Sequence, residues 1–356
     1  MNSVRASAVA GLTTAALLVA TVALARAPRI DVAGFTATGS LPKGVTVSPD
    51  GTRLYVTNYG QHNRRNISVY DASDLHRIEE IDVPGIVVES AIAPDGRTLY
   101  VSNFTRSTVQ FVDLATRTVT REVQTSGRNP KILVLSVDGR RLFAANWSSA
   151  NVTEIDTATG TVVRTLQAGL NPRGMALTRD GKLFVANFFG HTIDVFEGAT
   201  LGQHHRIERV CHVPRHLVLS PDEHTLYVSC LGSNELLAMN PDNGHIEHRV
   251  LVGSAPKAAD VSSDGRFVFT ANYGGSSVSV VDTTDWTART LEIPLMDAAS
   301  GIVSARTGTR FFVTGWYDDH LYAVEPAGSG PGFTITPAQR AFTLQRREYH
   351  RLHPAE

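Results

Sequence analysis

Basic residues recur at one position of this sequence, each directly after a proline. The pairs are Pro42-Lys43, Pro130-Lys131, Pro172-Arg173, Pro214-Arg215 and Pro256-Lys257. Three of the chain's four lysines are among them, although the chain has 33 basic residues in all. Cations that converge repel one another, and an anionic ligand relieves that repulsion. The pattern therefore predicts an anion-binding site, if the fold brings the five residues together.

Two further copies of this position lack the cation. One reads Val87-Val88-Glu89 and the other Ala299-Ser300-Gly301, so we expect Glu89 as a lone carboxylate and Ser300 as a lone hydroxyl in a cationic ring. Aromatic residues follow at a second fixed position: Tyr59, Phe104, Trp147, Phe188, Tyr273 and Trp316. They either surround a ligand or pack as wedges between repeats. In the same way, each cation either binds a ligand or bonds the backbone of a neighbouring repeat.

The element that must position these residues is itself a repeat. A turn such as Ser48-Pro49-Asp50-Gly51 leads into a short apolar strand that ends on Asn58 and an aromatic residue. Equivalent positions are 58, 103, 146, 187, 230, 272 and 315, which are 41 to 45 residues apart. A period of this size with about four strands per unit is typical of a β-propeller. Seven copies predict an all-β, seven-bladed propeller with four-stranded antiparallel blades.

The units Leu54-Tyr55-Val56-Thr57-Asn58 and Leu99-Tyr100-Val101-Ser102-Asn103 resemble the YVTN family of β-propeller repeats. The resemblance covers roughly residues 30–325. It implies the propeller fold and a place among surface and periplasmic proteins, many of which have no known activity. Relatives by fold include bacterial lactonases and several cofactor-bearing domains. The Trp-Asp dipeptide of WD40 repeats is absent, which disfavours that intracellular scaffold family.

In a propeller, the inner strand of each blade lines the central channel. Its start shares a face with the loop after the second strand, so the five cations should ring one mouth of the channel. The segment Ile30 to Thr38 precedes the first inner strand, as an outer strand does elsewhere in the repeat. We expect this N-terminal strand to close the last blade, and Phe333 to Thr336 is the rival for that place.

The chain divides into three parts. Residues 1–25 read as a signal peptide or an uncleaved membrane anchor, because Arg5 precedes an uncharged run that ends in Ala23-Leu24-Ala25. Residues 26–325 form the propeller, and residues 326–356 are a Gly/Pro linker with a basic tail. The tail is either solvated or loosely docked, or it is a partner-binding arm. We expect a secreted, periplasmic or cell-envelope protein.

The two cysteines, Cys211 and Cys230, both fall in the fifth blade. Cys211 precedes an inner strand and Cys230 ends the next strand, so both should lie at the same end of the blade. In an oxidising compartment such a pair forms a disulfide. The alternative is two buried free thiols.

The composition and the motifs of the chain exclude several classes of function. Charged residues make up 19% of the chain and the formal net charge is −1, which disfavours nucleic acid as a partner. The 13 histidines are not repeat-equivalent, and standard catalytic signatures are absent, so we expect neither a metal nor a cofactor. We also expect a monomer.

Two functions remain. The first is binding of an anionic small molecule or a cell-envelope partner at the cationic mouth. The second is a lactonase-like hydrolysis, or another reaction of a small molecule, with Glu89 as general base and Lys131, Arg173 and Arg215 as anion holders.

Overall fold

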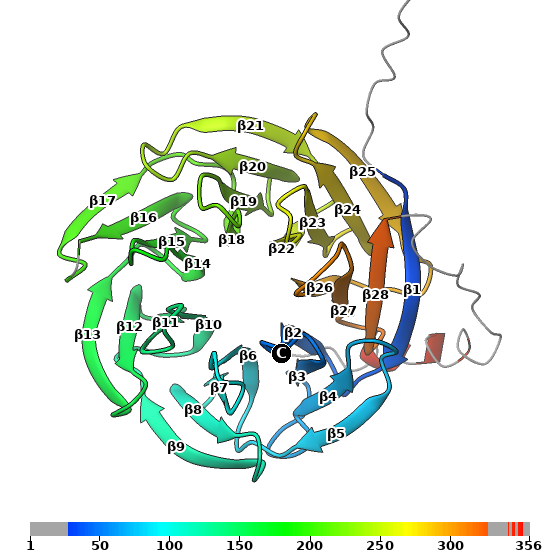
Figure 1. The fold of residues 1–356 in the computed structure, drawn as a ribbon, viewed down its shortest axis with the longest axis horizontal. Coiled ribbons are helices and arrows are strands. Elements are labelled where there is room, and N and C mark those ends of the chain that lie inside the picture. Colours follow the sequence, from blue (N-terminus) through cyan, green and yellow to red (C-terminus); the bar gives the residue numbers. More distant parts are fainter. Residues whose placement is uncertain (1–27, 199, 327–340, 342–343, 346–347, 352–356) are drawn as a thin grey trace, which may run out of the picture.

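The computed structural model describes residues 28–198, 200–326, 341, 344–345 and 348–351. Within these residues, 28 strands form seven four-stranded antiparallel sheets that are arranged in a ring around one axis (Figure 1). The prediction of a seven-bladed β-propeller is therefore confirmed. In this part of the chain, no helix is both long and apolar enough to cross a membrane.

From the axis outward, each blade contains an inner, a second, a third and an outer strand (Figure 1). The inner strands are β2 (Pro42–Val47), β6 (Val87–Ile92), β10 (Pro130–Leu135), β14 (Pro172–Leu177), β18 (Pro214–Leu219), β22 (Pro256–Val261) and β26 (Ala299–Ser304). The second strands are β3 (Arg53–Asn58), β7 (Thr98–Asn103), β11 (Arg141–Asn146), β15 (Leu183–Asn187), β19 (Leu226–Cys230), β23 (Phe267–Asn272) and β27 (Phe311–Gly315).

The third strands are β4 (Ile67–Asp71), β8 (Thr108–Asp113), β12 (Asn151–Asp156), β16 (Thr192–Glu197), β20 (Glu235–Met239), β24 (Ser277–Asp282) and β28 (His320–Pro326). The outer strands are β5 (Arg77–Ile81), β9 (Thr118–Gln124), β13 (Thr161–Gln167), β17 (Gln203–Ile207), β21 (Ile246–Leu251), β25 (Thr287–Glu292) and β1 (Ile30–Ala37).

The two ends of the propeller meet in the last blade. Strand β1 pairs antiparallel with β28, from Ile30 opposite Pro326 to Ala37 opposite His320, as Figure 1 shows in blue and orange-red. The predicted closure by the N-terminal strand is thus confirmed. The rival segment 333–336 and the predicted signal peptide lie outside the described residues. In the tail, residues 348–351 are helical, and His350 lies buried with its Nε2 3.0 Å from Asp319 Oδ2.

The repeated asparagine at the end of the second strand is a structural residue. Asn146 Nδ2 donates to Thr153 Oγ1 at 2.8 Å, and Asn272 Nδ2 donates to Ser279 Oγ at 2.9 Å. Both side chains are fully buried, where an unpaired amide would be costly. These asparagines therefore fasten the third strand to the second and are not available to a ligand.

The fifth blade replaces this asparagine with Cys230, which forms a disulfide with Cys211. The predicted pairing is confirmed. The bridge joins the segment before β18 to the end of β19, so it ties together the two strands next to the axis.

Candidate functional site

Each of the five predicted cations is the second residue of an inner strand, directly before an irregularity in its pairing. In β2, for example, the register with β3 shifts between Pro42 and Val45, and all seven inner strands shift at this place. Proline fits the first position because an N–H is not required there. The residue before each proline has a φ between 50° and 60°: Leu41, Asn129, Asn171, Val213 and Ala255. This recurrent bulge re-aims the basic side chains.

The five cations, Lys43, Lys131, Arg173, Arg215 and Lys257, are called the cation ring below, and the face of the propeller at which the inner strands begin is called the cation face. Lys43, Arg173, Arg215 and Lys257 are each only 6% to 8% exposed. Lys131 is half-buried. Such burial is unusual for basic side chains unless they are paired.

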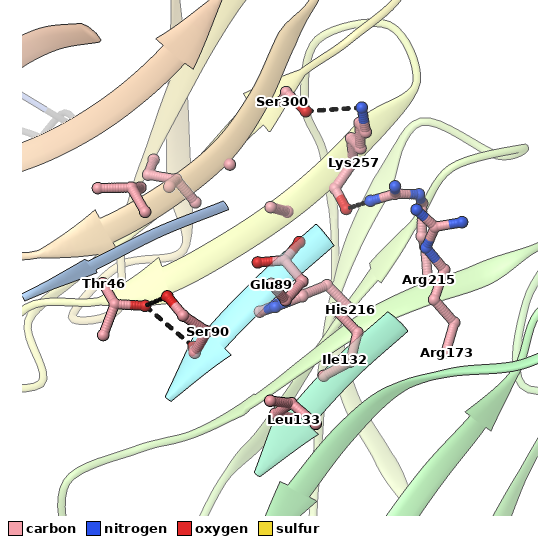
Figure 2. A pocket seen from close by; sticks show the side chains of 14 residues that line it. Thr46, Glu89, Ser90, Ile132, Leu133, Arg173, Arg215, His216, Lys257 and Ser300 are labelled. Atoms are coloured by element: carbon pink, nitrogen blue, oxygen red, sulfur yellow. Dashed lines mark hydrogen bonds between the residues drawn. The ribbon is translucent and has the colours of Figure 1, made fainter. Parts of the chain in front are cut away.

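A cavity of about 150 Å³ on the axis collects several of the predicted site residues (Figure 2). Its lining includes Glu89, Arg173, Arg215, Lys257 and Ser300, but neither Lys43 nor Lys131. Lys257 Nζ donates to Ser300 Oγ at 2.7 Å, and the Arg215 guanidinium donates to the backbone oxygen of Lys257. Figure 2 shows Arg173 and Arg215 reaching into the same part of the cavity.

The predicted aromatic residues contact the cations. Trp316 lies between two of them, with its ring centroid 5.2 Å from Lys43 Nζ and 4.6 Å from Lys257 Nζ. Trp147 also lies between two cations, with its ring centroid 3.8 Å from Lys131 Nζ and 5.2 Å from the guanidinium carbon of Arg173. Contacts of this kind favour the charged form by up to about 2 kcal/mol when they are desolvated. They orient the cations without neutralising them.

The cation ring contains no ion pair between one of its members and a described carboxylate. Arg173 Nε also has no hydrogen-bond partner, although it is buried. A buried donor without a partner costs free energy. The ring is thus incompletely satisfied by the chain's own described groups.

The electrostatic consequence is a lowered pKa at every member of the ring. Burial, reinforced by the charge of Arg173, lowers the pKa of Lys43 to about 7. Burial and the same arginine lower the pKa of Lys131 to about 5. Burial also lowers the pKa of Arg173 to about 10, and those of Arg215 and Lys257 well below their usual values. An anion in the cavity would reverse these shifts.

Glu89 lies one residue further along its strand than the cations do. Val87 pairs with Asn103 as Pro42 pairs with Asn58, so Val88 holds the cation position and Glu89 is equivalent to Gly44. The carboxylate passes over that glycine, where an added Cβ would lie 2.2 Å from Glu89 Oε2. Burial raises the pKa of Glu89, and the charges of Lys43, Arg173, Arg215 and Lys257 oppose this shift.

His216 is a cavity residue that the sequence did not reveal as part of the ring. It holds the same repeat position as Glu89, where the other blades have glycine, alanine or isoleucine. Burial, together with the charges of Arg215 and Arg173, lowers its pKa to about 4, so the imidazole is neutral at pH 7. Its Nδ1 has no hydrogen-bond partner. An imidazole at an otherwise small or apolar position is the signal that could have identified it.

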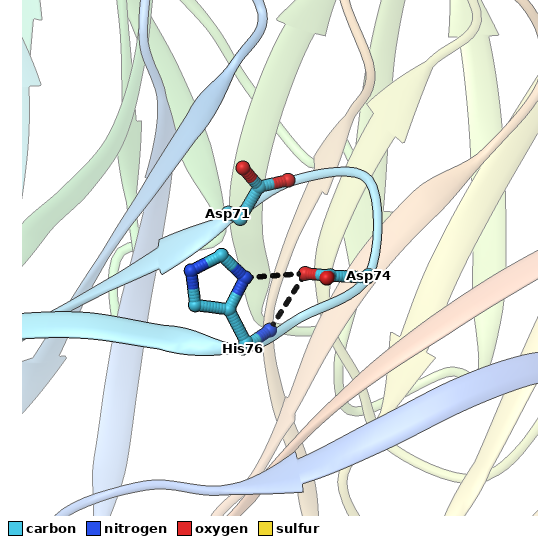
Figure 3. A group of neighbouring side chains, drawn as sticks. All are labelled: Asp71, Asp74 and His76. Atoms are coloured by element: carbon cyan, nitrogen blue, oxygen red, sulfur yellow. Dashed lines mark hydrogen bonds and ion pairs between the residues drawn. The ribbon is translucent and has the colours of Figure 1, made fainter.

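A second cluster of ionisable groups lies far out in the first blade, where Asp71, Asp74 and His76 meet (Figure 3). Asp71 accepts from the backbone N–H of Ser73 at 2.8 Å, and His76 Nδ1 lies 2.7 Å from Asp74 Oδ1. Asp113 accepts from the backbone of Thr116 in the corresponding turn of the second blade. The cluster is therefore explained by the turn between the third and outer strands.

Comparisons with known proteins agree with this architecture. A family model described as YNCE-like beta-propeller matches residues 87–313. A 6-phosphogluconolactonase of Bacillus subtilis (strain 168) is 33% identical over 84 residues, which cover 20% of this chain and 24% of that protein. The match thus spans about a quarter of the curated relative's length.

Two solved structures share the fold. Hydrazine synthase of Kuenenia stuttgartiensis matches with a TM-score of 0.71 and 18% identity, over 81% of this chain and 96% of that chain. The Cps50 (Swd1) beta-propeller domain of Myceliophteria thermophila matches with a TM-score of 0.71 and 13% identity, over 83% of this chain and 99% of that chain. At these identities the similarity concerns the fold alone.

Proposed function

The chain belongs to the YNCE-like β-propeller family, and from this premise we propose that it is an exported protein that binds a small anion in the cation ring. The observation that carries the proposal is the burial of Lys43, Arg173, Arg215 and Lys257 without an ion pair to any described carboxylate. Buried charge is costly unless it is compensated. An anion on the axis supplies that compensation.

The chemistry of the ring suits a carboxylate, sulfate or phosphate group. Guanidinium groups present planar pairs of donors that match such oxyanions, and lysines add mobile point charges. Arg173 brings a buried Nε that lacks a partner, and Ser300 brings a hydroxyl that already contacts Lys257. The cavity of about 150 Å³ admits a small group rather than a folded segment.

Sulfate tests the proposal because its charge is constant near neutral pH. A ligand that binds only the folded state, at a free concentration of 100 times its Kd, raises the free energy of unfolding by about 2.7 kcal/mol. We expect sulfate or citrate to raise the melting temperature of the wild type, and Arg173→Gln/Arg215→Gln to abolish this increase. The matched control is Arg97→Gln/Arg179→Gln, which removes the same charge from two exposed turns at the other end of the inner strands. Equal anion responses in both double variants would refute the site.

A second function, hydrolysis of a lactone, is favoured by Glu89, whose carboxylate lines the same cavity as Arg173 and Arg215. Glu89 would accept a proton from water as the water oxygen attacks the lactone carbonyl. The two arginines would stabilise the oxyanion, the ring C–O bond would break, and the alkoxide would take up the proton to give a hydroxy acid. The short match to a protein named 6-phosphogluconolactonase is consistent with this reaction.

Replacement of Glu89 with Gln separates the two functions. An enzyme of this kind loses turnover of a phosphorylated δ-lactone by about 10²-fold or more, while it still binds sulfate. A binding protein shows no lactone turnover above the buffer rate in either form and binds sulfate at least as tightly after the change. Wild-type turnover that survives in Glu89→Gln would exclude Glu89 as the base.

A further inference from the structure

The rim of the cation face differs in the fourth blade. Two residues of each blade form this rim: the one two positions before the inner strand begins, and the one two positions after the second strand ends. In five blades a backbone hydrogen bond joins them: Gly60 to Ser40, Ser148 to Arg128, Gly232 to His212, Gly274 to Ser254 and Tyr317 to Asp297. The fourth blade has Leu170 and Phe189 at these positions, and the second blade has Gly85 and Thr105. The fourth blade alone among the seven thus has two apolar side chains here.

Both residues are open to solvent. Leu170 is 57% exposed and Phe189 is 55% exposed, whereas the other aromatic residues of the cation face are half-buried or buried. The repeat does not require them, because the other blades have small or polar residues at one or both positions. Exposed apolar side chains gathered at the opening of a polar site are typical of a ligand-binding surface.

Phe189 connects the exposed rim to the cation ring through two other aromatic residues. The Phe189 ring lies 4.8 Å from the Phe188 ring and 6.1 Å from the Trp147 ring, measured between centroids. The guanidinium carbon of Arg173 in turn lies 5.8 Å from the Phe188 centroid and 5.2 Å from that of Trp147. A row of aromatic rings therefore leads from Arg173, which has no ion pair with a described carboxylate, to the solvent-exposed Phe189.

The seventh blade provides a contrast. Its rim residue Tyr317 lies against the chain's own tail, with its ring centroid 6.2 Å from that of His350, which is 4% exposed. The rim of the seventh blade is thus partly covered from within the molecule. Leu170 and Phe189 remain exposed in the same structure.

We infer that Leu170 and Phe189 form the apolar half of the ligand site, and that the ligand is a small carboxylate with an aryl or branched alkyl group. This inference rests on the proposed anion binding and narrows its ligand class. The carboxylate lies on Arg173 and its neighbours, and the apolar group lies along Trp147 and Phe188 to the fourth-blade rim. Charge complementarity at one end and aromatic contact at the other define the occupant.

The test compares three probes by quenching of tryptophan fluorescence, since Trp147 and Trp316 both contact the cation ring. The probes are 3-phenylpropionate, propionate and 3-phenylpropan-1-ol. We expect 3-phenylpropionate to bind about tenfold more tightly than propionate, as burial of one aromatic ring allows. The alcohol should not compete with sulfate, because it lacks the charge.

Leu170→Ser/Phe189→Ser should remove the tenfold advantage and leave sulfate and propionate affinity unchanged. Val137→Ser/Leu251→Ser is the matched control, since it removes two apolar side chains that are 69% and 75% exposed outside this rim. This control should bind all probes as the wild type does.

Three results would overturn the inference and leave the anion site intact. In the first, sulfate binds and 3-phenylpropionate binds no better than propionate. In the second, the rim variant keeps the full tenfold advantage. In the third, sedimentation shows a dimer that the rim variant dissociates, which assigns the rim to a second copy of the chain. Absence of sulfate and carboxylate binding altogether would instead refute the proposed function itself.

Discussion

In the third blade, the carboxylate of Glu154 lies between two arginines, with 2.7 Å from Oε1 to Arg141 Nε and 2.7 Å from Oε2 to Arg164 Nε. At the cation ring, Arg173 and Arg215 are buried almost as deeply, at 8% and 6% exposure, yet no described carboxylate pairs with either. The same chain thus buries charge in two ways. In the blade the opposite charge comes from the protein, whereas at the ring the protein supplies only the Glu89 carboxylate for five cations, and a ligand is free to supply more.

Internal pairing is the rule elsewhere in the molecule. Asp194, which is fully buried, lies 2.6 Å from Arg206 Nε and 3.1 Å from His204 Nε2. Arg266 reaches the buried Asp282 at 3.1 Å in the same way. Side-chain hydrogen bonds with Arg206 and Asn187 outweigh the effect of burial and lower the pKa of Asp194. The cation ring therefore departs from how this protein otherwise compensates buried charge.

Loss of the Glu154 charge should destabilise the third blade more than any other substitution considered below. Glu154→Gln removes the charge that two arginines share, and both guanidinium groups lose an ionic partner. We expect the free energy of unfolding to fall by about 1.5 to 3 kcal/mol, the range for a hydrogen bond to a charged group, because Arg141 Nε donates to Glu154 Oε1 while Arg164 contributes an ion pair without a hydrogen bond. Urea unfolding at pH 7 measures it, with Glu247→Gln on the exposed outer strand β21 as control. A loss no larger than that of the control would show that the pairing contributes nothing.

At the cation ring, removal of an ionisable side chain should leave the free energy of unfolding unchanged or raise it. Lys131→Met removes a basic group that has no ionic partner and whose pKa burial lowers to about 5, and it keeps a side chain of similar length against Trp147. The amine is therefore largely uncharged at pH 7 in anion-free buffer, and an apolar side chain in place of this half-buried polar group should be neutral or stabilising, by up to about 1 kcal/mol. Lys182→Met is the control, because Lys182 Nζ lies 3.1 Å from Asp242 Oδ1. Loss of this ion pair should slightly lower the free energy of unfolding. A loss above 1 kcal/mol for Lys131→Met would mean that the ring stabilises the blades.

The contrast between the two regions explains what the sequence could and could not predict. The blade count and the closing strand followed from the repeat, because the propeller fixes one strand set per period. The disulfide followed from the positions of Cys211 and Cys230 in that repeat. The place of Glu89 did not, because the bulge after the first residue of β6 lets consecutive residues reach the axis.

Pairing across a blade was also invisible in the sequence. Arg141 and Arg164 are not distinguishable by type from Arg173, and only the register of β11, β12 and β13 places them beside Glu154. The absence of such a partner at the ring is likewise a property of the assembled structure. His216 was missed for a related reason, because its role depends on which side chains surround the axis.

The affinity for sulfate should change only modestly with pH, through the protonation of Lys43. Because the pKa of Lys43 is about 7, this lysine loses most of its charge between pH 6 and pH 8 in the free protein. Sulfate favours the protonated form, so its affinity should rise as pH falls through 7, by about fivefold from pH 8 to pH 6, or about 1 kcal/mol. His216, with a pKa of about 4, is neutral across this window, and Arg173, with a pKa of about 10, stays charged.

Two variants isolate the cause. Lys43→Arg keeps the charge across the whole range and should remove most of the fivefold change that the wild type shows. Burial also lowers the pKa values of Lys131 and Lys257, so a smaller pH dependence that remains in this variant belongs to those lysines. Burial raises the pKa of Glu89, so its protonation at low pH would also favour sulfate, and Glu89→Gln removes that contribution. If the fivefold change persists in Glu89→Gln and disappears in Lys43→Arg, the proton belongs to Lys43, and binding compensates a charge that the folded chain leaves unpaired. If it persists in Lys43→Arg and disappears in Glu89→Gln, the carboxylate is the titrating group and the lysine is not. A flat profile in the wild type would place sulfate away from the ring, because no anion could bind among these groups without shifting their protonation.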